Sequence, residues 1–553
     1  MFATVVAAVF MSNLDLFIVN VALPAIGRSF GGSDLGSLSW VLNGYAIVFA
    51  ALLVVAGRVA DGSGHKPVFL TGLAVFTLAS IGCALAPDVG TLVAARLVQA
   101  AGAALLMPTS LALLLDTTAP EKRAGAVRAW ASIGGIAAGL GPVAGGLLAE
   151  AGWRWVFIVN VPVGIAAFAL GVKVLPTPPR AGAEKGPLPD LFGAALLTGS
   201  IAVLALALVK APDWGWTNAA TLGARAAAVL LAIWFVLRSA RHPVPIVELP
   251  LLRVPAFASA AAALTLFTVA FAGMLLGAVL WCQGVRGYSA LRTGLAIAPG
   301  PLLVPPVALR IGPAVARFGA GRIALAGTVL FAAGILWWAA TLDTGSAYAT
   351  SLLPGMMLTG LGVGMTLPVL TGASAAALPP ARFATGSAIT SMGRQIGAVL
   401  GIAILVGILG TPTPADTVAA FQHGGYAVAA ASLLAACATI PLIRKPQAAS
   451  RNRPPPSSHS PRRSATPESG SRPSLDGRAP PSPESPHSQK TGTREPRLSH
   501  LDITLHHPVR PPPRSCCGRR APARERADDG RGRSGRQLPR HCRSGLQMVG
   551  ERI

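Results

Sequence analysis

The stretch FASAAAALTLFTVAFAGMLLGAVLW, residues 257–281, contains no charged residue. It is longer than the roughly 20 apolar residues that an α-helix needs to cross the hydrocarbon core of a membrane. Similar stretches recur between residues 2 and 443, separated by short polar segments. Of the 553 residues, 52% are hydrophobic and 12% are charged, whereas soluble domains carry about 25% charged residues. The sequence therefore predicts an all-α polytopic membrane protein.

The apolar stretches predict about fourteen membrane spans. The first stretch begins at Met1 without a basic leader, so we expect a span there and no cleavable signal peptide. The expected spans are residues 2–25, 39–57, 67–86, 90–114, 127–150, 155–175, 190–209, 220–238, 257–281, 290–311, 321–341, 348–371, 385–409 and 423–443.

Basic residues divide unequally between the loops on the two sides of the membrane. With a cytoplasmic N-terminus, the inner loops hold fifteen Lys and Arg residues and the outer loops hold five. This bias is the positive-inside pattern, and it supports both the orientation and the order of the spans. The net charge of +24 therefore reflects topology and a basic tail, and we expect no nucleic-acid partner. The inner set is Arg58, Lys66, Lys122, Arg123, Arg128, Lys173, Arg180, Lys185, Arg238, Arg241, Arg253, Arg310, Arg317, Arg322 and Arg382; the outer set is Arg28, Arg154, Lys210, Arg286 and Arg292.

The two halves of the apolar region share a spaced pattern. Two related halves are typical of transporters, in which one helical bundle rocks against the other. The pattern therefore favours a transporter. The matching pairs are Gly57 and Gly312, Gly64 and Gly319, Leu70 and Leu325, Gly72 and Gly327, Phe76 and Phe331, Gly102 and Gly362, and Pro108 and Pro368.

These observations predict four regions. Residues 1–175 and 257–445 are each expected to form a six-helix bundle, and residues 176–256 two linking helices that match neither half. Residues 446–553 are basic and rich in Pro, Arg and Ser. Such a composition buries too little apolar surface to fold, so we expect a disordered tail and assign it no function.

The loop after the second span reads GRVADGSGHKPVFLTG. Glycines allow a tight connection, and Asp61 and Lys66 are suited to bridging neighbouring helix ends, although an ordinary charged loop is the alternative. The loop resembles the signature G-x-x-x-D-R-x-G-R-R/K of the major facilitator superfamily, with Gly62 and His65 where Arg is usual. The resemblance implies a gating loop with a weakened charge latch. The matching residues are Gly57, Asp61, Gly64 and Lys66.

Two charges lie inside apolar spans. Asp15 is the only carboxylate of the first span, and Arg96 lies in the fourth with Gln99 one turn away. Charges inside a membrane are costly and usually face a partner or an aqueous cavity. A carboxylate in such a place is suited to proton exchange. The alternatives are a packing hydrogen bond for Asp15 and an arginine that reaches to the outer interface for Arg96.

The stretch LDLFIVNVALP around Asp15 resembles the L-D-x-T-I-V-N-V-A-L-P signature of the fourteen-span drug:proton antiporters, with Phe17 in place of Thr. The stretch that begins at Arg96 resembles the family's R-x-x-Q-G-x-G motif, with Ala100 in place of the first Gly. The resemblance implies that Asp15 is the proton site and Arg96 its electrostatic modulator. The sequence leaves open whether the two side chains touch.

The fifth span contains the string GLGPVAGG. Small residues let helices approach closely, so generic helix packing is one explanation. The string also resembles the motif that marks antiporters within the superfamily, and the following WRWVFIVNVPVG is typical of the fourteen-span subgroup. The antiporter-motif residues are Gly135, Gly139, Gly141, Pro142, Gly145 and Gly146.

Several other polar residues in the spans are candidates for a substrate cavity. For Arg394, packing against backbone carbonyl groups remains an alternative. No phosphate-binding loop or metal-ligand spacing is present, so we expect no cofactor and no enzyme. The resemblance implies that the proton gradient is the energy source. The candidates are Asn20, Asn43, Gln99, Arg394 and Gln395.

The resemblance implies a major facilitator fold, with two pseudo-symmetric six-helix bundles and two inserted helices. It implies a proton-coupled antiporter that exports hydrophobic or cationic small molecules across the bacterial cytoplasmic membrane. The expected partners are the substrate, protons and the lipid bilayer, and we expect a monomer. A dedicated exporter of one metabolite or lipid, a non-transporting sensor or scaffold, and a membrane enzyme are the alternatives.

Overall fold

The computed structural model describes residues 2–119, 122–176, 190–343, 345, 347–379, 382–413 and 415–444. The chain divides into two compact units, residues 1–457 and 458–553, and every described residue belongs to the first. Within the described part the secondary structure is helical and contains no strand. The predicted tail, 446–553, lies outside the described residues.

The N-terminal half is a bundle in which close helix contacts depend on glycine. α3 and α4 pack so tightly that a Cβ at Gly102 would lie 2.6 Å from the backbone nitrogen of Phe76. α6 and α7 together form one span, Trp155–Val174. The helices are α1 (Phe2–Ser29), α2 (Leu35–Ser63), α3 (His65–Leu85), α4 (Val89–Asp116), α5 (Arg123–Ala151), α6 (Trp155–Ile158) and α7 (Asn160–Val174).

The C-terminal half repeats this arrangement with one broken span. The tenth predicted span, residues 290–311, consists of α12 and α13, and α14 follows it with a bend of 60° between Ala290–Arg310 and Gly312–Phe318. Pro305 and Pro306 lie inside α13, before the bend, and each removes a backbone N–H from the helix. The elements are η2 (Leu249–Arg253), α11 (Pro255–Leu280), the π-helix η3 (Trp281–Val285), α12 (Ala290–Ile297), α13 (Pro299–Arg310), α14 (Gly312–Phe318), α15 (Ala320–Thr341), α16 (Leu352–Ala376), α17 (Phe383–Leu409) and α18 (Thr417–Arg444).

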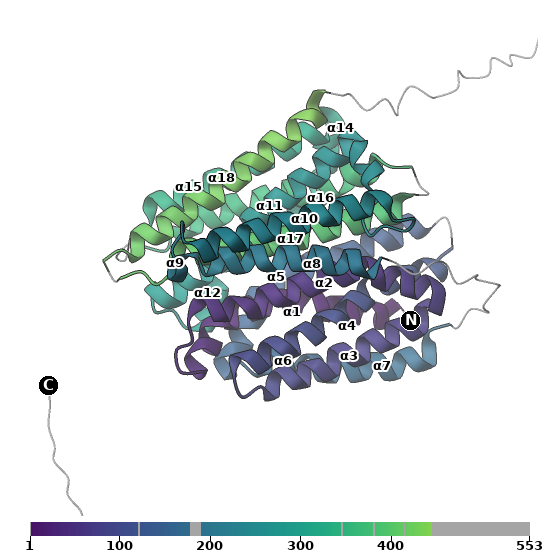
Figure 1. Cartoon of the computed structure of the whole chain (residues 1–553), viewed down its shortest axis with the longest axis horizontal. Coiled ribbons are helices and arrows are strands. Elements are labelled where there is room, and N and C mark those ends of the chain that lie inside the picture. The colour runs from purple at the N-terminus through teal and green to yellow at the C-terminus, as the bar shows by residue number, and fades with distance from the viewer. Residues whose placement is uncertain are drawn as a thin grey trace, which may run out of the picture. The chain divides into compact units, whose positions relative to one another are not determined.

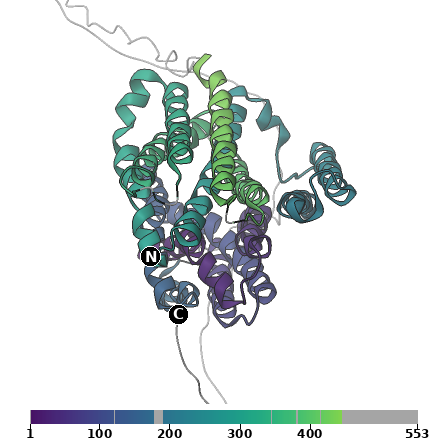
Figure 2. The ribbon, with the colours of Figure 1, turned by 90° about the vertical axis from the view of Figure 1, so that its left-hand side faces the viewer.

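Two inserted helices, α8 (Leu191–Val209) and α10 (Ala219–Arg241), lie beside the halves, joined through α9 (Ala211–Trp214). Figure 2 shows this pair at one side of the bundle. α8 packs against α2 from the first half and α17 from the second, and α10 packs against α8. The inserted pair therefore covers the seam between α2 and α17.

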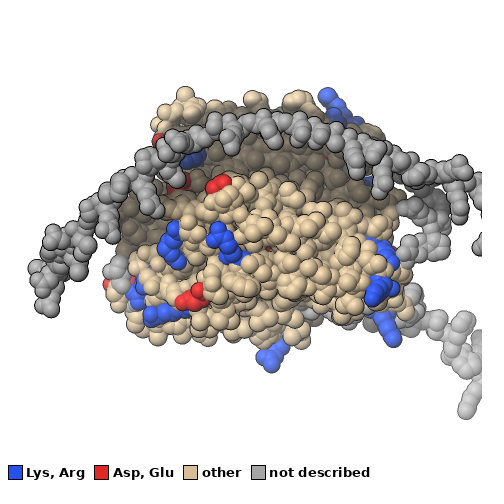
Figure 3. Space-filling model, turned by 90° about the horizontal axis from the view of Figure 1, so that it is seen from below, with Lys and Arg blue, Asp and Glu red and all other residues tan. Residues whose placement is uncertain are grey.

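Membrane-spanning character is clear from the helices. Twelve described helices are long and apolar enough to cross a membrane, or thirteen if the bent pair is one span. The helix at the fifth predicted span, α5, contributes a shorter apolar segment, Ile136–Ala151. Figure 1 shows the long helices side by side, and in Figure 3 the visible face is mostly uncharged, with charged residues gathered towards its two ends. The prediction of an all-α polytopic membrane protein is confirmed.

The two halves meet closely between α5 and α12. A Cβ at Gly294 of α12 would overlap the carbonyl oxygen of Pro142 in α5, and a Cβ at Gly146 would lie 2.7 Å from the carbonyl oxygen of Ala290. The backbone N–H of Leu291 also donates to a Glu150 carboxylate oxygen at 3.2 Å. This contact between the halves therefore requires glycine.

We predict that Gly294→Ala weakens the contact between the halves, because the added methyl group meets backbone that cannot move aside. Overpacking of this kind costs about 1–3 kcal/mol. Thermal unfolding of the purified protein in detergent should show a lowered midpoint. Gly312→Ala is the matched control, since a Cβ at Gly312 meets no atom within 4 Å. Equal midpoints for the two variants would contradict the prediction.

One buried carboxylate joins the two inserted helices, α8 and α10, to each other. Asp190, 2% exposed, accepts from the backbone N–H of Gly193 at 2.8 Å and from Arg238 Nε at 2.8 and 3.0 Å. Burial disfavours the charged form, but these hydrogen bonds and the nearby Arg238 charge outweigh it and hold the pKa of Asp190 below its ordinary value. The group therefore caps α8 and joins it to α10.

We predict that the advantage of Asp190 over asparagine depends on pH. Because the folded pKa is lowered, this stabilisation is fully present above the unfolded pKa of about 3.9 and is lost as pH falls through the folded value. Thermal midpoints of the native and Asp190→Asn proteins should differ by a constant amount above about pH 5 and converge as the pH falls from about 5 to about 2. Arg238→Gln should reduce the pH dependence of the thermal midpoint, because it removes the positive charge that helps to lower the pKa of Asp190. A constant difference between native and Asp190→Asn midpoints across this range would refute it.

Candidate functional site

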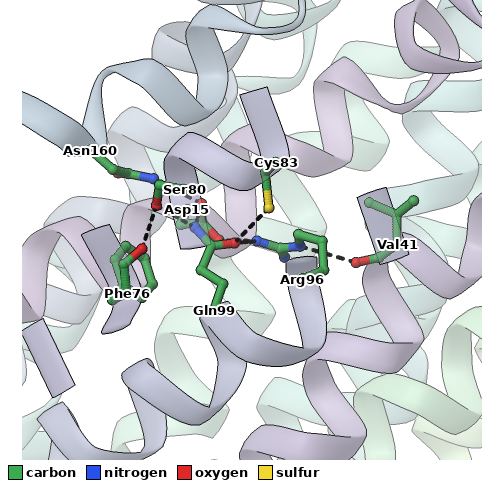
Figure 4. A network of polar contacts seen from close by, with 8 residues as sticks. All are labelled: Asp15, Val41, Phe76, Ser80, Cys83, Arg96, Gln99 and Asn160. Atoms are coloured by element: carbon green, nitrogen blue, oxygen red, sulfur yellow. Dashed lines mark hydrogen bonds and ion pairs between the residues drawn. The ribbon is translucent and has the colours of Figure 1, made fainter. Parts of the chain in front are cut away.

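The two intramembrane charges named from the sequence lie in direct contact. Asp15 on α1 and Arg96 on α4 are both 0% exposed. Arg96 Nη1 donates to Asp15 Oδ2, and the two side chains form a salt bridge. The pair lies within the N-terminal half, enclosed by α1, α2, α3, α4 and α7, as Figure 4 shows.

Uncharged side chains hold the carboxylate from further directions. Gln99 Nε2 donates to Asp15 Oδ1 at 3.1 Å and to Ser80 Oγ at 2.8 Å. Asn160 Nδ2, from α7, donates to the same Asp15 oxygen at 3.1 Å. Four helices therefore take part in hydrogen bonds at one point, and both oxygens of the buried carboxylate are satisfied.

Arg96 is held by its own set of contacts. Its Nε donates to the carbonyl oxygen of Val41 at 3.2 Å, and its Nη1 also donates to Gln99 Oε1 at 2.5 Å. The guanidinium carbon lies 4.1 Å from the centre of the Tyr45 ring, a cation–π contact. Arg96 Nη2 is buried without a hydrogen-bond partner among the described residues. The guanidinium is therefore fixed, with one donor unused.

Asn160 and Ser80 are site residues that sequence reasoning did not single out. Asn160 is 145 residues from Asp15 in the chain and belongs to the WRWVFIVNVPVG stretch. The available signal was a lone amide near the start of an apolar helix. Ser80 gives a weaker signal, because serine is frequent in membrane helices, where its hydroxyl often bonds the backbone of the same helix.

The loop-motif residues join helix ends within the N-terminal half. Lys66 Nζ donates to the carbonyl oxygens of Val172 and Leu175 at the end of α7, at 3.0 and 2.6 Å. His65 lies 2.7 Å from a carboxylate oxygen of Asp116 and 3.7 Å from one of Asp61. Gly64 adopts φ of 94°, which favours glycine, whereas Gly57 has no such constraint. The loop therefore links α2 and α3 to α4 and α7.

The antiporter-motif glycines of α5 bring it against α1. A Cβ at Gly141 would overlap Phe17, and a Cβ at Gly145 would lie 2.9 Å from the Cα of Ile18. Both α1 residues lie within one turn of Asp15. Gly139 instead approaches the carbonyl oxygen of Pro301 on α13. Gly146 and Pro142 meet α12, as described above, and the surroundings of Gly135 lie outside the described part.

The other substrate candidates stand apart from the Asp15 network. Asn20 is 8% exposed and its Oδ1 has no partner, and Asn43 is fully buried with neither amide atom bonded, among the described residues. Gln395 is half-buried with Nε2 unpartnered, and Arg394 is exposed. Only Gln99 of the five lies in the network. Within the described residues, no group of three or more His, Cys, Asp or Glu is placed to hold a metal.

We predict that Arg96 and Asp15 are strongly coupled in stability. Arg96→Gln leaves a buried, unpaired carboxylate, and breaking one side of a buried pair costs about 3–5 kcal/mol. Asp15→Asn combined with Arg96→Gln should cost less than the sum of the two single changes. A double-mutant cycle by denaturant unfolding of the purified protein measures the coupling. Additive losses would show that the pair does not stabilise the fold.

The chain is similar to known membrane transporters. A family model for the Major Facilitator Superfamily matches residues 5–312. The tetracenomycin C resistance and export protein of Streptomyces glaucescens is 34% identical over 72% of this chain and 74% of its own. The methylenomycin A resistance protein of Streptomyces coelicolor is 34% identical over 79% and 90%. The multidrug resistance protein Stp of Mycobacterium tuberculosis is 36% identical over 72% and 74%.

Solved structures agree on the fold. A POT peptide transporter in complex with alafosfalin matches with a TM-score of 0.58 and 16% identity, covering 80% of this chain and 95% of that one. At this identity the likeness concerns fold alone. Together with the apolar helices, the relatives place the chain in the cell membrane as a multi-pass transporter of small molecules. The chain belongs to the Major Facilitator Superfamily.

Proposed function

We propose that the protein exports amphipathic small molecules, antibiotics among them, in exchange for protons. The observation that carries the proposal is the Asp15–Arg96 pair, because it places a fully buried carboxylate, a group suited to bind a transported proton, inside a membrane-spanning bundle. The names of the relatives support export of antibiotics. No cofactor is needed, since the proton gradient supplies the energy.

Protonation of Asp15 changes the interactions that hold α1 against its neighbouring helices. A neutral carboxyl loses its ion pair with Arg96, while Gln99 and Asn160 still offer hydrogen bonds. α1 also contacts the second half, because Gln283 of η3 donates to the carbonyl oxygen of Val21 at 2.8 Å. A change at Asp15 thus reaches the seam between the halves along one helix. Alternating access by rocking of the two halves uses such a path.

Coupling requires that proton and substrate favour different states. If substrate binding weakens proton binding, the proton weakens substrate binding by the same factor. Each proton that moves inward down a membrane potential of 100 mV releases about 2.3 kcal/mol. Since Asp15 is 0% exposed here, exchange of its proton takes place when the bundle rearranges.

A dedicated exporter of one metabolite is the second candidate. Two of the relatives are named for a single antibiotic, tetracenomycin C or methylenomycin A, and one for multidrug resistance. Efflux of a panel of chemically unrelated dyes and antibiotics from cells that produce the protein separates the two candidates.

We predict that Asp15→Asn abolishes substrate movement driven by an imposed pH difference, while the protein remains in the membrane. The asparagine has the same size and can still accept hydrogen bonds at its one oxygen, but it cannot carry a proton. Everted membrane vesicles with a fluorescent substrate and a pH-sensitive dye measure both fluxes. Asp88→Asn is the control, because Asp88 is an exposed helix cap that asparagine replaces well. Proton-coupled transport at the native rate by Asp15→Asn would remove Asp15 from the mechanism.

A further inference from the structure

Arg394 lies deep in a helix of the second half, yet its side chain is exposed. It is twelfth of the residues of α17, so roughly 16 Å of helix separates it from the nearer end at 1.5 Å per residue. An arginine at this depth is too far from the helix end to reach the interface easily. The surroundings of Arg394 must therefore provide water or a partner inside the membrane.

The residues that share this side of α17 are polar. Ser387 is exposed and Ser391 half-buried, and both lie within about 60° of Arg394 at 100° per residue. Gln395, with its unpartnered Nε2, borders the same strip. By contrast α10 exposes apolar side chains to its surroundings, including Leu230 at 65%. A polar strip of this kind suits an aqueous path and not a lipid surface.

The remaining sides of α17 are occupied by neighbours. Gly393 and Gly397 pack against Thr265 of α11, about 60–100° from Arg394 on one side, and Gly401, two turns further along and about 20° from Arg394, packs against Val269 of the same helix. Met392 shares an apolar cluster with residues of α2, on the opposite side of the helix. Gly407 packs against the Leu208 carbonyl of α8, also away from Arg394. The polar strip therefore points away from α8, which covers the outside of the seam.

Among the described residues, no carboxylate neutralises this arginine. Helices α11 to α18 contain no Asp or Glu, and no described residue forms a hydrogen bond or an ion pair with Arg394. In the first half, by contrast, Arg96 already has Asp15. Arg394 is thus a positive charge with its donors unused, and a guanidinium is well suited to bind a carboxylate through paired hydrogen bonds.

We propose that Arg394 binds an acidic group of the transported molecule, a carboxylate or phenolate, and so makes amphipathic organic acids preferred substrates. This inference rests on the proposed export function and narrows it. The sequence-based expectation of cationic substrates is disfavoured at this position, because a cation would meet an unneutralised like charge. Arg394 is in this sense a specificity-determining residue.

Binding to a matched pair of probes tests the inference. The probes are 7-(diethylamino)coumarin-3-carboxylic acid and its N-methylamide, which share one aromatic body and differ in charge. Fluorescence titration of purified protein in nanodiscs, with no proton gradient, gives each Kd. Arg394→Gln should weaken binding of the acid by about 10- to 100-fold and change binding of the amide by less than about twofold. Arg394→Lys should lie between the native protein and Arg394→Gln.

Arg322→Gln is the matched control, since Arg322 is also an exposed arginine of the second half but lies near the end of α15. Its affinities should equal those of the native protein. An equal loss of affinity for both probes in Arg394→Gln would indicate a general packing defect and overturn the inference. Absence of acid binding by the native protein, or unchanged acid binding in Arg394→Gln, would overturn it as well.

A transport measurement separates this inference from the proposed function. Native protein in liposomes should export both probes when a pH difference is imposed, with KM lower for the acid. Export of both with equal KM in native and Arg394→Gln proteins refutes the role of Arg394 and leaves the exporter function intact. Failure to move either probe, or any antibiotic of a broad panel, counts against the exporter function itself.

Discussion

The buried ion pair between Asp15 and Arg96 constrains the whole N-terminal half. Both side chains are 0% exposed, and removing two charges from water is costly unless hydrogen bonds satisfy them. The helices that satisfy them must therefore meet at one level in the membrane. Gln99 and Ser80 are bonded to each other, and Asn160 comes from a helix far along the chain. Small shifts of any of these helices would leave a buried charge poorly bonded.

The second constraint on the structure is the close approach of α5 to α1 and α12, which glycine residues of α5 permit. The residues next to Asp15 on α1, Phe17 and Ile18, lie directly against Gly141 and Gly145. The same helix meets the second half at Gly146. α5 therefore lies between the charged site and the contact between the two halves. A side chain in place of these glycines would clash with α1 or with α12. A larger apolar residue at one of these glycines would push α5 away from α1 or from α12.

The sequence shows the charges and the spans but not which helices are neighbours. Asp15 and Arg96 stand out because each is charged within an apolar stretch. Their contact could not be predicted, since they are 81 positions apart in the chain and helix order in space is set by packing. Asn160 could not be assigned to the site for the same reason, since it is 145 positions from Asp15 in the chain. The sequence did not predict the bend of 60° between Arg310 and Gly312, because an apolar stretch indicates a span but not the angle between its helices.

Charge is arranged differently in the two halves, despite their shared pattern of glycines. The first half has a carboxylate that neutralises its deep arginine, whereas the helices of the second half hold Arg394 and no acid. On the proposed function, the proton would bind in one half and the charged end of the substrate against the other. Transport by rocking of one bundle against the other then changes the distance between the two ligands in every cycle. Competition for one shared site is not required, because opposite preferences for the two arrangements of the halves are enough to couple the fluxes.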